Sequence, residues 1–72
     1  MALTRAKMEA LWVLEDGPIP AATGLQANGI QRRTMTALCD DGLARYFPFG
    51  KPPNYRITPE GRRAALAAAG NL

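Results

Sequence analysis

Apolar residues recur at three-residue spacing near the start of the chain. Over residues 4–15 they are separated by good helix formers such as Ala, Lys and Glu, so this segment predicts an amphipathic helix. Thr4 is suited to the N-cap of the helix, and Gly17 followed by Pro18 ends it. The residues that form the apolar stripe are Met8, Leu11 and Leu14.

Two helices separated by a tight turn are predicted next. The first is short and weak: it begins at Pro20, a residue suited to the first helical position, and runs through Leu25. It contains Gly24, which lowers its stability by roughly 1 kcal/mol relative to alanine. Asn28 and Gly29 form a turn signal that stops it.

Residues 31–41 predict the second helix of this pair, followed by Gly42 in the left-handed conformation. A rotation of 100° per residue places Leu38 at the centre of a buried face that also includes Ile30, Thr34 and Met35. Asp40 falls on the opposite face. The residues expected to project outward from the first two turns are Arg32, Arg33 and Thr36.

A hairpin and a terminal helix complete the predicted elements. Residues 43–47 are rich in aliphatic and aromatic side chains, and residues 55–57 resume a strand-like pattern after a loop that contains three prolines. Thr58, followed by a proline and an acid, predicts the start of a helix that runs to Ala69. We therefore expect one domain over residues 1–72, mainly α-helical with a small β-hairpin, in the order helix, helix, helix, strand, strand, helix.

The charge distribution favours a polyanionic partner. The net charge is +3, from nine Lys and Arg and six Asp and Glu, and the whole excess lies in the second part of the chain. No acidic residue occurs between Leu43 and Thr58. The single cysteine, Cys39, allows no internal disulfide and is expected to be a small buried hydrophobe. No apolar run approaches the length of a membrane span and no signal-peptide pattern opens the chain, so we expect a cytoplasmic protein without a membrane partner.

Enzymatic chemistry is not expected. The chain has no histidine, no paired carboxylates at convergent spacing and no glycine-rich phosphate loop, so we assign no catalytic residue, metal or cofactor. Asp40 and Asp41 lie at the end of a predicted helix, where acids are slightly unfavourable to the helix dipole. The role expected for them is solubility or pairing with an arginine of the hairpin.

Three stretches, over residues 3–14, 33–43 and 55–62, resemble the winged helix-turn-helix transcriptional regulators of the MarR and PadR type. The last is the most specific, because Tyr-x-Leu/Ile-Thr-x-x-Gly at the end of the wing recurs in such domains; here it reads Tyr55-Arg56-Ile57-Thr58-Pro59-Glu60-Gly61. The resemblance covers nearly the whole chain. It implies a transcriptional regulator whose third helix enters the major groove of double-stranded DNA and whose hairpin, the wing, contacts the backbone. The small size of the chain suits a bacterial or phage protein.

Two features depart from that family. The stretch between Gly29 and Gly42 is about one helical turn shorter than usual, which predicts a small groove-reading surface. The additional helices through which the family dimerises have no counterpart before Thr4 or after Ala69, so both a monomer and a homodimer stay open.

The residues expected to bind DNA lie on the third helix and the wing. Arg32 and Arg33 lie near the positive end of their helix, where guanidinium groups can meet phosphate oxygens or guanine edges. The alternative for them is a solvated helix face. For the wing cations the alternative is a charged edge that blocks aggregation. The full set is Gln31, Arg32, Arg33, Thr36, Arg45, Lys51 and Arg56.

A second function stays open: a winged-helix adaptor or inhibitor that binds another protein, such as polymerase, in place of DNA. The short third helix and four apolar side chains motivate it. Core packing is nevertheless the role expected for Trp12, and packing beneath the loop is expected for both phenylalanines. The four side chains are Trp12, Val13, Phe47 and Phe49.

Overall fold

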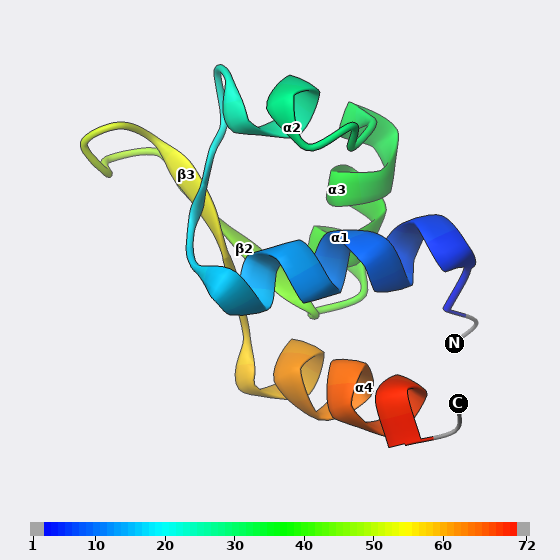
Figure 1. The fold of residues 1–72 in the computed structure, drawn as a ribbon. Coiled ribbons are helices and arrows are strands. Elements are labelled where there is room, and N and C mark those ends of the chain that lie inside the picture. The colour runs from blue at the N-terminus through cyan, green and yellow to red at the C-terminus, as the bar shows by residue number, and fades with distance from the viewer. Residues whose placement is uncertain (1–2, 71–72) are drawn as a thin grey trace.

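The protein has a mixed α/β fold. The computed structural model describes residues 3–70, which form four helices and a three-stranded antiparallel sheet (Figure 1). The first, third and last predicted helices and both strands of the hairpin are present, whereas the second helix begins later than predicted and a third strand makes the fold mixed α/β, where a mainly α-helical fold was expected. In chain order the elements are α1 (Arg5–Asp16), β1 (Ile19–Pro20), α2 (Gly24–Ala27), α3 (Arg32–Asp40), β2 (Ala44–Phe47), β3 (Asn54–Ile57) and α4 (Pro59–Gly70).

The segment after α1 is a strand, so the prediction of a helix beginning at Pro20 is wrong over its first turn. Ile19 and Pro20 pair antiparallel with Tyr55 and Asn54 of β3, which gives the strand order β1-β3-β2. Proline has no amide proton to donate, but an edge strand tolerates it. Helix α2 begins only at Gly24, where a Cβ atom would lie 2.5 Å from Cγ2 of Ile19. Glycine therefore permits the close approach of α2 to β1.

Helices α2 and α3 both end in a Schellman motif around a glycine of positive φ. The φ angle is 67° at Gly29 and 77° at Gly42, as expected for left-handed caps. In each motif the amide after the glycine donates to the carbonyl four residues before the glycine, at 2.8 Å in α2 and 2.9 Å in α3. Only residues 28–31 separate the two helices, which confirms the predicted tight turn.

The core lies where α1, α3, α4 and the sheet meet. Helix α1 packs against both α3 and α4, and Figure 1 shows it between the α2–α3 pair and α4. The stripe predicted on α1 is confirmed for Leu11 and Leu14, which are buried in one cluster with Met35 and Leu38 of α3, whereas Met8 is only partly buried. Thr4 caps α1 by accepting a hydrogen bond from the Lys7 amide at 3.2 Å.

Thr58 joins α4 to the end of α3 and the start of β2. Its hydroxyl accepts from the Gly61 amide at 3.0 Å, which confirms the predicted N-cap, and donates to the Gly42 carbonyl at 2.6 Å. Its own amide donates to the Leu43 carbonyl at 3.1 Å. A Cβ atom at Gly61 would collide with the same carbonyl oxygen of Leu43. The Thr-x-x-Gly motif is therefore a structural junction that fixes the direction in which the hairpin leaves the helices.

None of the helices within residues 3–70 combines the length and the apolar character that a membrane span requires.

Candidate nucleic-acid interface

Helix α3 presents its polar side chains to solvent as predicted. Arg32, Arg33 and Thr36 are exposed, whereas Met35 on the other side of the helix is fully buried. The side chain of Gln31, at the N-cap position, does not cap the helix. Its Oε1 atom instead accepts a hydrogen bond of 2.8 Å from Nε of Arg33, which orients that guanidinium at the start of α3.

The hairpin turns a pair of tyrosines toward α3. Tyr46 and Tyr55 are directly opposite across the strands, with ring centroids 5.0 Å apart. Burial raises the pKa of the Tyr55 phenol and the nearby Cys39 thiol adds to the rise, while the Arg32 guanidinium lowers the pKa. Both of these groups belong to α3, which packs against β2, so this face of the hairpin lies beside α3.

The other face of the hairpin carries two arginines. Arg45 and Arg56 are cross-strand partners, and since successive side chains alternate, they point away from the tyrosine face. Arg56 is held in place, because its guanidinium carbon lies 4.6 Å from the Phe47 ring centroid and its Nε donates to Oδ1 of Asn54 at 3.1 Å. Two of the seven predicted DNA-binding residues are thus on a different face from the cations of α3.

The loop between β2 and β3 carries the remaining predicted cation, Lys51, which is exposed. Phe49 in the same loop is 94% exposed, so the expectation that it packs beneath the loop is wrong. Phe47 is half-buried under Arg56. Trp12 of α1 is 36% exposed, which also contradicts its predicted place in the core.

Ion pairs within residues 3–70 involve the cations of α1 and α4 only. Arg5 pairs with Glu9, and Arg63 pairs with Glu60. Asp41 pairs with Lys7 of α1 at 2.9 Å, and not with an arginine of the hairpin as expected. Among these described residues, the cations of α3 and the hairpin form no ion pair with an acid. They are Arg32, Arg33, Arg45, Lys51 and Arg56.

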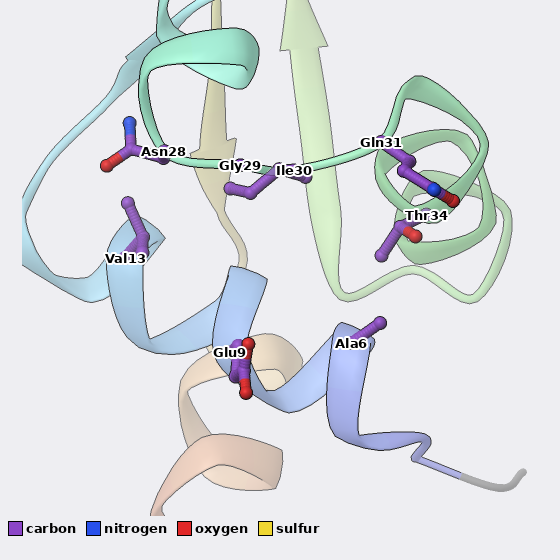
Figure 2. Close-up of a pocket in the computed structure, with 8 residues that line it drawn as sticks. All are labelled: Ala6, Glu9, Val13, Asn28, Gly29, Ile30, Gln31 and Thr34. Atoms are coloured by element: carbon purple, nitrogen blue, oxygen red, sulfur yellow. The ribbon is translucent and has the colours of Figure 1, made fainter.

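A groove of about 360 Å³ lies between α1 and the turn that joins α2 to α3 (Figure 2). Its one ionisable lining residue is Glu9, whose carboxylate pairs with Arg5 at 3.1 Å. The groove therefore offers no basic group to a phosphate. The lining residues are Ala6, Glu9, Val13, Asn28, Gly29, Ile30, Gln31 and Thr34.

Sequence reasoning missed Tyr46 as a candidate contact. Its side chain is 45% exposed and lies on the same face of the hairpin as Tyr55, its cross-strand partner. Tyrosine hydroxyls are among the groups that donate hydrogen bonds to DNA phosphates. Because side chains alternate along a strand, Tyr46 shares a face of β2 with the buried Ala44. This placement could be predicted only once the bounds of β2 were known.

Over residues 3–70, no group of three or more His, Cys, Asp or Glu side chains is placed to hold a metal ion. No family model, curated protein or solved structure matches this chain.

Proposed function

We propose that this chain is a winged helix-turn-helix domain of the kind found in MarR- and PadR-type transcriptional regulators, and that it binds double-stranded DNA. In this proposal α3 enters the major groove and the β2–β3 hairpin acts as the wing. The observation that carries it is the set of five cations on α3 and the hairpin that have no acidic partner within the described residues.

The dimensions of α3 suit this role. Nine residues give a helix of about 14 Å, which is comparable to the width of the major groove at about 12 Å. Arg33 lies at the start of α3, where its fork can reach a guanine edge, and Arg32 beside it can reach a phosphate. Arg45 and Arg56, on the far face of the hairpin, can contact the DNA phosphates that flank the groove. Lys51 can contact DNA phosphates at the tip of the wing.

The salt dependence of binding tests the proposal quantitatively. Each phosphate contact by a cation lowers the slope of log K against log salt by about 0.9. If four or five of these cations contact phosphates, the slope is about −3.6 to −4.5, and affinity falls about 150- to 500-fold between about 50 and 200 mM salt. Fluorescence anisotropy with random and genomic duplexes measures both the slope and the preference for sequence.

Single substitutions then separate the roles of the cations. Arg33→Ala is expected to reduce discrimination between sequences, whereas Lys51→Ala weakens binding to all duplexes alike and reduces the slope by about 1. Arg63→Ala is the matched control, because it removes the same charge from α4, where Arg63 pairs with Glu60. It should leave affinity nearly unchanged.

Two results would reject the proposal. One is the absence of binding to any duplex at low salt. The other is an Arg63→Ala variant that loses as much affinity as Lys51→Ala, which would mean that binding follows net charge alone. If DNA binding is absent and a stoichiometric protein is recovered from nuclease-treated lysate, the adaptor function replaces the regulator.

A further inference from the structure

Phe49 is the most exposed large hydrophobic side chain of the described residues, and it lies at the end of the hairpin. Its exposed fraction is 94%, compared with 63% for Leu66, 45% for Tyr46 and 36% for Trp12. Figure 1 shows the loop between β2 and β3 projecting beyond the helices. Because nearly all of its surface is in solvent, Phe49 contributes little to the stability of the fold.

The loop that carries Phe49 is tied down at its C-terminal end, over residues 52–54. The side chain of Asn54, which is buried, donates to the Pro52 carbonyl at 2.9 Å and accepts from Arg56. The Pro53 carbonyl accepts a hydrogen bond of 2.9 Å from the Ala21 amide, which connects the loop to the segment after β1. A ring presented on such a constrained loop loses little conformational entropy when it binds.

The surroundings of Phe49 favour DNA as its partner. The hairpin and its loop carry three exposed cations and no acid between Leu43 and Thr58. A protein pocket for the ring would also have to supply acids for these cations. Duplex DNA can bind both the cations and the ring, because its phosphates pair with the cations and its stacked bases present a flat apolar surface to the ring.

We propose that Phe49 is an apolar wedge that inserts between neighbouring base pairs in the minor groove beside the major groove occupied by α3. This inference rests on the proposed function. Phe49 follows the end of β2 at Phe47, in the loop that projects beyond the helices (Figure 1). Phenylalanine is one of the residues that proteins insert between base steps from the minor groove.

Phe49→Ala tests the wedge directly. Affinity for duplex DNA is expected to fall about fivefold to 150-fold, the range found when an aromatic side chain that stacks on a base is removed. The salt slope should stay the same, because no charge is lost, whereas Lys51→Ala reduces it by about 1. Leu66→Ala is the matched control: it removes a second exposed apolar side chain, on α4, and should leave affinity unchanged.

A duplex containing 2-aminopurine reports the insertion itself. Wild-type protein should raise the fluorescence of a probe at the unstacked step, and Phe49→Ala should abolish that rise at saturating protein. Circular dichroism of the variant should match wild type, since Phe49 is 94% exposed. Phe49→Trp should retain both the affinity and the fluorescence rise.

The outcomes distinguish the wedge from the proposed function. If wild type binds duplex DNA and Phe49→Ala binds equally well, with the same fluorescence rise, the wedge is wrong and the regulator proposal stands. The wedge is also wrong if wild type binds single-stranded DNA more tightly than duplex. It is wrong as well if Phe49→Ala loses a protein partner without any change in its affinity for DNA. If wild type binds no duplex at all, the proposed function fails and the wedge fails with it.

Discussion

Substituting Gly61 by alanine perturbs the contact that holds α4 against the start of β2. The new Cβ atom would collide with the Leu43 carbonyl oxygen and lie 2.9 Å from the carbonyl carbon of Leu43 and from Cγ1 of Ile57. Since two of these three atoms belong to the backbone, no rotamer change relieves the clash, and the first turn of α4 must move away. That movement strains the two hydrogen bonds of Thr58 to Gly61 and to Leu43, at 3.0 and 3.1 Å.

The expected loss follows from these contacts. Overpacking destabilises by about 1 to 3 kcal/mol, and two weakened hydrogen bonds add about 1 kcal/mol each, so Gly61→Ala should lower the free energy of unfolding by about 3 to 5 kcal/mol. A domain of this size has roughly 4 to 11 kcal/mol in total. At 4 to 8 °C per kcal/mol, the Tm should fall by at least about 12 °C.

Urea unfolding followed by circular dichroism measures the effect. Gly70→Ala is the matched control, because it lies in the same helix and nothing lies within 4 Å of its added Cβ. It should be neutral or slightly stabilising. If the free energy of unfolding of Gly61→Ala is within about 0.5 kcal/mol of both wild type and Gly70→Ala, the structural role of Gly61 at this junction is refuted. Differences of that size are typical of neutral surface changes.

Two further predictions concern polar groups at the C-terminal end of α3 and the residue that caps it. A double-mutant cycle between Lys7 and Asp41 should give a coupling of about 1 kcal/mol in the free energy of unfolding, because the 2.9 Å pair is partly buried, and a coupling near zero would contradict a structural role. Burial raises the pKa of the Cys39 thiol and Asp40 adds to the rise, so at about pH 8 native protein should alkylate more slowly than urea-unfolded protein, with the gap closing as pH rises. Equal rates at that pH would contradict this shielding.

Local signals identified most elements because each leaves a pattern in consecutive residues. The helical period of α1 and α3, the glycines after α2 and α3, and the threonine before α4 all act within a few positions. Strand β1 left no such pattern. It is two residues long, one of them proline, and its pairing with β3 joins positions 19 and 55, so only the folded chain defines it.

The candidate site was predictable in part for the same reason. The outward direction of Arg32 and Arg33 follows from the helical period, but the face on which Arg45 lies depends on where β2 begins and on its register with β3. The exposure of Phe49 could not be predicted, because loop residues follow no period. The Lys7–Asp41 pair joins positions 34 apart in the sequence, and no local rule identifies such a contact.

The charges on α3 are unfavourable to its own helix dipole. A substitution that reverses one of them is therefore expected to stabilise the fold while it weakens DNA binding. Arg32 and Arg33 occupy the first turn and Asp40 the last, whereas a helix is stabilised by acids at its start and bases at its end, by about 0.3 to 1 kcal/mol per charge. Arg33→Glu should therefore raise the free energy of unfolding by about 0.3 to 1 kcal/mol or more and abolish DNA binding. Urea unfolding and anisotropy on the same preparation measure both effects. A stabilised variant that still binds DNA would show that Arg33 lies outside the interface, whereas a destabilised one would show that its bond to Gln31 outweighs the dipole.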